Sequence, residues 1–235
     1  MDKTIAPQGA LTPQKLARGR GTPAIFETLR EEIIGLVLTP GTVLSRHELQ
    51  ARFSLSATPI RDALLRLQLE GLVDVFPQHA TVVSPIDLER ARAAQFLRRS
   101  IELELVRMLA LEPAKAPVTK LRSLIRQMQT LAELHEYEAF NLADQAFHRT
   151  MYEARGVADL YDLVKRQGAH IDRLRRLNLP VAGKMEEILV EHTAIVDAIA
   201  AGDPEGAQQG LRAHLSRSLQ FVDTLKEQFP QYFAR

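Results

Sequence analysis

The residue pattern of this chain changes once, at Ser84-Pro85-Ile86, and that change predicts a two-part architecture. Before it lie two short β-branched or aromatic runs, LVDVF and TVVSPI, which the turn-like PQHA separates. Such runs predict a β-hairpin. After it, helical patterns follow one another to the end, with breaks at proline and glycine and no strand pattern or internal repeat. A chain of 235 residues has room for two domains.

The N-terminal part contains three helical patterns before the hairpin. Apolar residues recur at helical spacing over 24–37. Ser45 precedes the second helix with a glutamate three residues later, which is a capping-box pattern. The third helix is expected to have Thr58 as its N-cap and Pro59 at its first position. Three helices and a hairpin within residues 23–85 predict a winged helix-turn-helix.

The C-terminal part, residues 86–235, is predicted to be an all-α six-helix bundle, so the protein as a whole is expected to be mostly α. Residues 1–22 are rich in proline, glycine and alanine, and they are expected to form a flexible arm. The six helices are expected near 87–112, 116–135, 137–155, 158–178, 183–201 and 204–228.

Composition excludes several classes of protein. Cysteine is absent, so there is no disulfide framework, thiolate nucleophile or cysteine metal site. No apolar run approaches the length of a membrane span, and the first residues lack the apolar core of a signal peptide. These features fit a protein of the reducing cytoplasm without a membrane partner.

Charge is distributed unevenly although the net charge is only +1. Residues 1–22 carry a net +3, whereas residues 23–85 have five basic and seven acidic side chains. The proposed DNA-binding segment is therefore not broadly basic. This counts against strong non-specific binding to DNA, which depends on phosphate neutralisation.

Three histidines and one aspartate of the helical part are spaced so that their side chains are expected to lie close together. Asp144 and His148 are four residues apart, so both project from one face of a helix. His192 and His214 each lie about eleven residues from the turn near Asp203, so antiparallel helices would bring them level. One carboxylate and three imidazoles suit zinc, nickel, manganese or iron. A single core histidine, however, is more often a packing residue.

The segment PGTVLSRHELQARFSLSATPIRDALLRLQLEGLVDV (residues 40–75) resembles the DNA-binding domain of the GntR family. The helical remainder resembles the FCD sensor domain of its FadR branch, through FLRRSIELELVRMLA, DQAFHRTMY, EHTAIVDAIAAGD and RAHL. The resemblance covers nearly the whole chain after about residue 24. It implies a homodimer that binds near-palindromic operator DNA, and six sensor helices would imply the VanR-like subgroup.

The resemblance also implies which residues contact DNA. Arg61 matches the second recognition arginine of the family, and Thr58 is expected to bond a phosphate. A solvated arginine and a plain helix cap are the alternatives. The family usually has arginine where Ala57 and His47 stand, although Arg46 is adjacent to His47, and glycine where Ala80 stands. The candidate DNA contacts are Arg46, His47, Ser56, Ala57, Thr58, Arg61 and His79.

The resemblance assigns Asp144, His148, His192 and His214 to a divalent transition metal, for which zinc or nickel is expected. In the family the metal helps to hold a carboxylate effector, and an arginine of the first sensor helix contacts the acid. The register favours Arg98 for that contact, with Glu102 one turn further on. A plain pairing of Arg98 with Glu102 on the helix surface is the alternative.

These expectations define a regulator, predicted to be a repressor that a small organic acid releases from its operator. A DNA-binding protein whose helical domain only dimerises is the second hypothesis. A metallohydrolase is a remote third, because an open metal position can activate water. No partnered nucleophile, phosphate-binding glycine loop or dinucleotide motif supports an enzyme.

Overall fold

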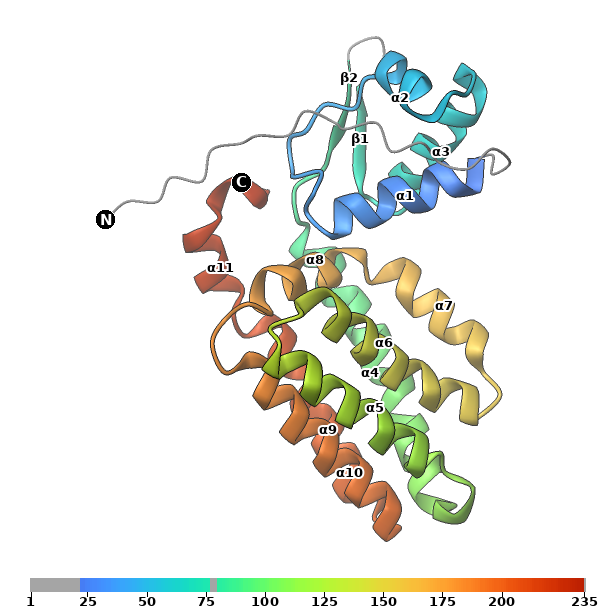
Figure 1. The fold of residues 1–235 in the computed structure, drawn as a ribbon, viewed down its shortest axis with the longest axis vertical. Helices are drawn as coiled ribbons and strands as arrows, with labels where there is room; N and C mark the ends of the chain where they lie inside the picture. The colour runs from blue at the N-terminus through green and yellow to red at the C-terminus, as the bar shows by residue number, and fades with distance from the viewer. Residues whose placement is uncertain (1–21, 77–79, 235) are drawn as a thin grey trace.

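The computed structural model describes residues 22–76 and 80–234, so most of the predicted arm and the wing-tip His79 lie outside it. Figure 1 shows a small N-terminal domain above a larger helical domain. The elements of the small domain are α1 (Thr22–Ile34), α2 (Arg46–Phe53), α3 (Ala57–Leu69), β1 (Val73–Phe76) and β2 (Ala80–Val83). The two strands are antiparallel, with Val73 opposite Val83. The predicted winged helix-turn-helix is confirmed.

Local sequence explains where α2 and α3 begin. The Ser45 hydroxyl accepts a hydrogen bond from the Glu48 backbone N–H, as expected for the N-cap of α2. For α3 the prediction was wrong by two residues, because Ser56 is the N-cap and Thr58 lies inside the first turn. Pro59 is tolerated there because the first turn of a helix has no intrahelical acceptors for its N–H groups.

The core of the small domain consists of the apolar faces of α1 and α3 with the inner side of the wing. Leu29, Ile33, Leu64 and Val83 are buried together in it. A fully buried leucine or isoleucine stabilises a fold by about 1.5–3 kcal/mol. The opposite face of α3 does not contribute to this core, and it is exposed to solvent.

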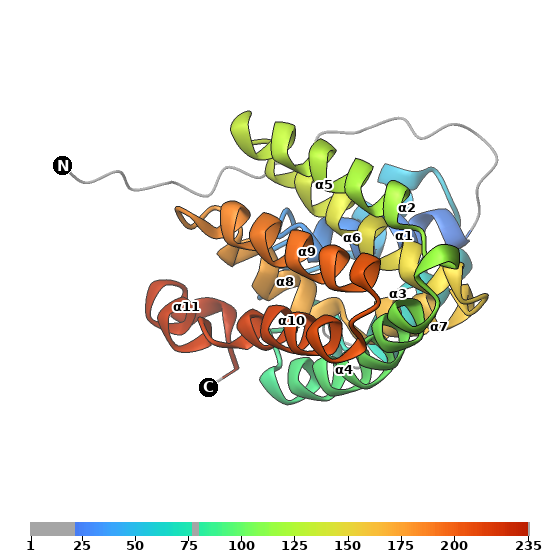
Figure 2. The ribbon, with the colours of Figure 1, turned by 90° about the horizontal axis from the view of Figure 1, so that it is seen from below.

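The helical domain is a bundle, viewed from below in Figure 2. Its helices are α4 (Leu88–Leu111), α5 (Val118–Glu133), α6 (Tyr137–Ala154), α7 (Ala158–Gln167), α8 (Ala169–Asn178), α9 (Lys184–Ala201), α10 (Pro204–Ser216) and α11 (Val222–Gln228). Short 3₁₀ turns occupy Pro113–Lys115, Arg217–Leu219 and Pro230–Tyr232.

Two helices predicted as continuous are divided, so the described residues do not form six. The expected helix 158–178 breaks at Gly168, where glycine has low helix propensity and α8 takes a new direction. The expected helix 204–228 is interrupted by the 3₁₀ turn at Arg217–Leu219. The VanR-like subgroup, which the count of six implied, stays a prediction.

The turn between α9 and α10 aligns the two helices that carry His192 and His214. Gly202 has φ +70°, a left-handed conformation that favours glycine, and Asp203 caps α10 by accepting from the Gly206 N–H at 2.9 Å. The two helices then return antiparallel and pack on α4 around Val106, Ile195 and Leu211, among other buried residues.

The two domains meet at α1 and α8, which contact each other. Ala169 of α8 belongs to the apolar core of the small N-terminal domain. The connecting segment is also paired with the C-terminal end, because the Ile86 N–H donates to the Tyr232 carbonyl at 2.7 Å. The linker therefore contacts the C-terminal segment, and its Ile86 side chain is buried.

Candidate functional site

The four residues assigned to a metal lie together in the bundle core. Asp144 and His148 come from α6, His192 from α9 and His214 from α10, and one ligand atom of each lies within 4.8 Å of all the others. The Nε2 atom of His214 is 3.3 Å from that of His148 and 3.4 Å from that of His192. All four side chains are buried.

Carboxylates lie behind two of the rings. Glu102 Oε2 is 2.9 Å from Nδ1 of His148, an ion-pair distance without hydrogen-bond geometry. Glu191 Oε2 is 2.9 Å from Nδ1 of His214 and accepts a hydrogen bond from it, so Nε2 of His214 presents a lone pair to the cluster. The Nε2 atoms of His148 and His214 face each other at 3.3 Å, a separation that suits either a shared proton or a shared cation.

Burial sets the charge state of the cluster. It lowers the pKa of His148 to about 4 and that of His192 well below its ordinary value, so both rings are neutral at pH 7. Burial alone would raise the pKa of Asp144, but the Arg175 guanidinium and the nearby histidines hold it well below its ordinary range. The cluster therefore contains the Asp144 carboxylate, the neutral imidazoles of His148 and His192, and the ring of His214.

This donor set fits a transition metal. Asp144 Oδ1 is buried, has no hydrogen-bond partner among the described residues, and lies 3.6 Å from Nε2 of His192. The 3.3 and 3.4 Å separations between the Nε2 atoms match tetrahedral edges of about 3.3–3.4 Å, which follow from metal–nitrogen bonds of about 2.0–2.1 Å. Three imidazoles and a carboxylate are ligands that zinc and nickel accept.

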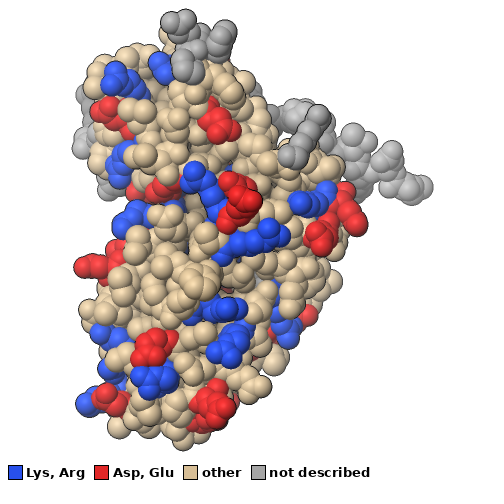
Figure 3. All heavy atoms as spheres, turned by 180° about the vertical axis from the view of Figure 1, so that it is seen from behind, with Lys and Arg blue, Asp and Glu red and all other residues tan. Residues whose placement is uncertain are grey.

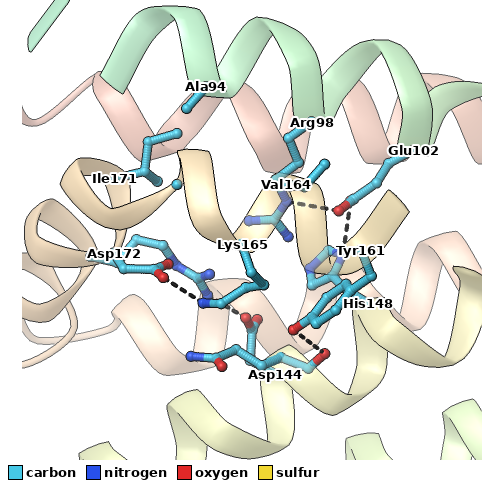
Figure 4. A pocket seen from close by; sticks show the side chains of 13 residues that line it. Ala94, Arg98, Glu102, Asp144, His148, Tyr161, Val164, Lys165, Ile171 and Asp172 are labelled. Atoms are coloured by element: carbon cyan, nitrogen blue, oxygen red, sulfur yellow. Dashed lines mark hydrogen bonds and ion pairs between the residues drawn. The ribbon is translucent and has the colours of Figure 1, made fainter. Parts of the chain in front are cut away.

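Arg98 and Glu102 of α4 lie beside the cluster, as Figure 4 shows. Arg98 Nε donates to Glu102 Oε1 at 2.8 Å, so the two residues do pair, but in the interior and not on the helix surface. Burial would raise the pKa of Glu102, yet Arg98 and His148 lower it to about 2. Glu102 therefore links the arginine to the histidine ring.

Two cavities adjoin the cluster and share Arg98 and Arg175 in their walls. His148 and Asp144 line the first cavity, and His214 lines the second. A ligand that reaches the cluster therefore meets both guanidinium groups. His135 and His170, the other two histidines of the helical domain, line neither cavity.

Sequence reasoning missed Arg175 and Glu191. Arg175 of α8 donates to Asp144 Oδ2, and nothing in its spacing distinguishes it from Arg173 and Arg176 on the same helix. Glu191 precedes His192 and faces His214 on the antiparallel helix. One signal for Glu191 was available in the sequence. It immediately precedes the candidate ligand His192, and the antiparallel turn places it level with His214.

The candidate DNA contacts that are described lie on the exposed parts of α2 and α3. Arg46 and His47 begin α2, whereas Ser56, Ala57, Thr58 and Arg61 lie at the start of α3, and all six are exposed. His79 lies outside the described residues. Figure 3 shows basic and acidic side chains interspersed over the face seen there. This mixture agrees with the sequence of residues 23–85, in which basic and acidic side chains are similar in number.

No helix among the described residues is long and apolar enough to cross a membrane.

A winged helix-turn-helix joined to a helical bundle with an enclosed polar cluster defines a class of two-domain transcriptional regulators. The sequence model described as "Bacterial regulatory proteins, gntR family" matches residues 22–83, and the "FCD domain" model matches residues 93–217. The chain belongs to the GntR family of transcriptional regulators with an FCD domain.

Relatives and solved structures agree with this assignment. The chain is 36% identical over 211 residues to an uncharacterized HTH-type transcriptional regulator in an unstable DNA locus of Streptomyces ambofaciens, covering 89% of this chain and 88% of that protein. It is 25% identical to the HTH-type transcriptional repressor RspR of Escherichia coli (strain K12), covering 89% and 92%. Escherichia coli McbR/YncC shares the fold, with TM-score 0.70, 20% identity, and 88% and 98% coverage.

Glu191→Gln is expected to weaken zinc binding about 10–100-fold, the usual cost of losing a carboxylate that orients a metal-binding histidine. The neutral amide no longer holds the proton of His214 on Nδ1. The affinity is measured by competition with a chromogenic chelator. Glu186→Gln, an exposed position on the same helix, is the matched control. Equal affinity in both variants contradicts the role of Glu191.

Proposed function

We propose that this protein is a ligand-responsive repressor, which a small organic acid bound at a transition-metal site releases from its operator. The observation that carries the proposal is the convergence of Asp144, His148, His192 and His214, one ligand atom of each lying within 4.8 Å of all the others. The name of the relative RspR supports repression, since that protein is a transcriptional repressor. A homodimer reading two half-sites would give the small DNA-binding domain useful specificity.

The chain's own residues would bind the acid from two sides. The metal, zinc or nickel, supplies a positive centre for a carboxylate when it is held by the aspartate and three histidines. Arg98 and Arg175 supply guanidinium groups, which match carboxylates in charge and geometry. Both are paired internally, with Glu102 and Asp144, so an incoming acid competes with these carboxylates.

Helix α8 connects this pocket to the DNA-binding domain. Asp172 and Arg175 line the first cavity. Arg173, between them, is completely buried and donates to the linker carbonyls of Ser84 at 2.9 Å and Pro85 at 3.4 Å.

His170 accepts a hydrogen bond from the Asp87 N–H at 3.1 Å, at the N-terminus of α4. From α7, the carbonyl of Lys165 accepts from Arg30 of α1 at 2.8 Å. A shift of α8 on ligand binding would therefore reach the DNA-binding domain. A ligand changes that equilibrium only by its differential affinity for the two states.

The test uses the untagged full-length protein and a DNA fragment that it selects from a random library. Metal content is measured by elemental mass spectrometry, beside a double variant with His148→Ala and His214→Ala. The expected result is one metal ion per chain in the wild type, none in the variant, and metal-dependent release of DNA by organic acids. A wild type without metal after reconstitution, whose DNA binding no acid alters, favours a helical domain that only dimerises.

Arg61→Ala is expected to weaken specific operator binding at least tenfold, because a bidentate arginine–guanine contact contributes about 1–3 kcal/mol of discrimination. Arg61 is exposed near the start of α3. Fluorescence anisotropy with the selected fragment measures the change. Arg66→Ala is the control, because that guanidinium lies 4.2 Å from the ring centre of Phe26. An unchanged footprint for Arg61→Ala contradicts this placement of the recognition helix.

A further inference from the structure

The second cavity differs from the first in the charge of its walls. Three cations and three carboxylates line the first cavity, so its charges balance. The second is lined by four cations and a single carboxylate, Glu191. Arg98 and Arg175 are common to both, so the excess of the second cavity comes from Lys184 and Arg217.

Lys184 and Arg217 together hold one carboxylate oxygen. Glu187 Oε2 lies 3.2 Å from Nζ of Lys184 and 3.3 Å from Nη1 of Arg217. An anionic group therefore already occupies the space between these two cations. It belongs to the protein's own chain and does not line the cavity.

In the ion pair between Glu187 and Lys184, the glutamate is the more exposed partner. Its side chain is 44% exposed, whereas that of Lys184 is 9% exposed. The lysine is further fixed by the ring of Phe221, whose centre is 4.9 Å from Nζ. Glu187 can turn into solvent at little cost, because solvent-exposed ion pairs contribute little to stability. A ligand carboxylate can then replace it between the two cations.

The wall next to these cations offers an unsatisfied polar group. Asn178 lines the same cavity, and its Oδ1 is buried without a hydrogen-bond donor among the described residues. Buried polar groups are normally paired, so a polar group of a ligand or a water molecule is expected beside it. The cavity also reaches the metal cluster, because His214 forms part of its wall.

We propose that the effector is a dicarboxylate, with one carboxylate at the metal cluster and the second between Lys184 and Arg217 in place of Glu187. The inference rests on the proposed function and specifies its ligand class. Glu187 then acts as an internal competitor, so removing its charge strengthens binding, whereas removing the charge of Lys184 weakens it.

The experiment is calorimetric titration of the zinc-loaded full-length protein with matched acids: propionate against succinate, and lactate against malate. Each dicarboxylate is expected to bind at least tenfold more tightly than its monocarboxylate partner, since its second carboxylate accepts charge-assisted hydrogen bonds from Lys184 and Arg217. Lys184→Met is expected to abolish this preference and leave the affinities for propionate and lactate unchanged. Glu187→Gln is expected to raise succinate and malate affinity several-fold.

Each other outcome has a definite meaning. Equal binding of the paired acids by the wild type overturns the dicarboxylate inference and leaves the proposed function standing. Equal weakening of both members of a pair by Lys184→Met also overturns it, because the lysine then supports the whole site. Binding of none of the four acids overturns the inference together with the proposed metal-centred function. Thermal unfolding of each variant checks that the fold is retained.

Discussion

Replacing His192 with alanine is expected to reduce the metal content from one ion per chain to none and to abolish effector release, while operator binding remains. The ring is fully buried and stacks on Phe147, with centroids 3.9 Å apart and planes at 8°. Its Nε2 lies between Asp144 Oδ1 and His214 Nε2, so no neighbouring group can replace it. Elemental mass spectrometry and anisotropy with operator DNA measure the two effects.

A cavity left by alanine can destabilise a core by itself, so a second variant is needed. His192→Gln keeps most of the volume and is expected to lose the metal in the same way. His135→Ala, at an exposed position, is the control and is expected to behave as the wild type. Normal release of DNA by an effector in His192→Ala would rule out a metal-centred response.

The second large effect is expected for Arg173→Met, which separates ligand binding from DNA release. The methionine fills the buried space but cannot donate to the carbonyls of Ser84 and Pro85. We expect near-normal metal and acid affinities, with the effect of acid on operator affinity reduced to less than about twofold. Allosteric coupling of this kind typically changes affinity about 5–150-fold.

Arg176→Met is the matched control, because that side chain lies on the same helix and pairs with the exposed Glu138. Burial lowers the pKa of Arg173 to about 10, so the guanidinium remains charged at neutral pH. An unsatisfied buried carbonyl costs about 1–3 kcal/mol, so thermal unfolding accompanies the binding measurements. Full release by acid in Arg173→Met would place the coupling elsewhere, for example along α4.

Sequence pattern predicted the fold where local rules operate. The Ser45 cap and the turn at Gly202-Asp203-Pro204 are decided by residues close in the chain, and each lies where the pattern indicated. The two short strands also form, although the second is Ala80–Val83 and ends before the Ser84-Pro85-Ile86 of the predicted run TVVSPI. The errors fall where tertiary packing competes with local preference. Gly168 permits either a weak helix position or a break, and packing against α1 and α4 selects the break.

The four candidate metal ligands could also be predicted from the sequence, because i, i+4 spacing and an antiparallel turn fix which side chains share a face. The side chains that contact these ligands could not be predicted. Glu102 was expected as a neighbour of Arg98, yet it also lies against Nδ1 of His148 on another helix. Arg175 reaches Asp144 from α8 only because the chain breaks at Gly168.

The sequence by itself therefore determined the winged helix-turn-helix, the helical character of the remainder and the convergence of Asp144, His148, His192 and His214, since these depend on periodicity, capping and spacing along one or two helices. Only the tertiary structure decided which carboxylates lie behind His148 and His214, that two cavities flank the cluster, and that the buried Arg173 donates to the linker. Those features depend on contacts between helices far apart in the chain, and packing of the whole core fixes these contacts.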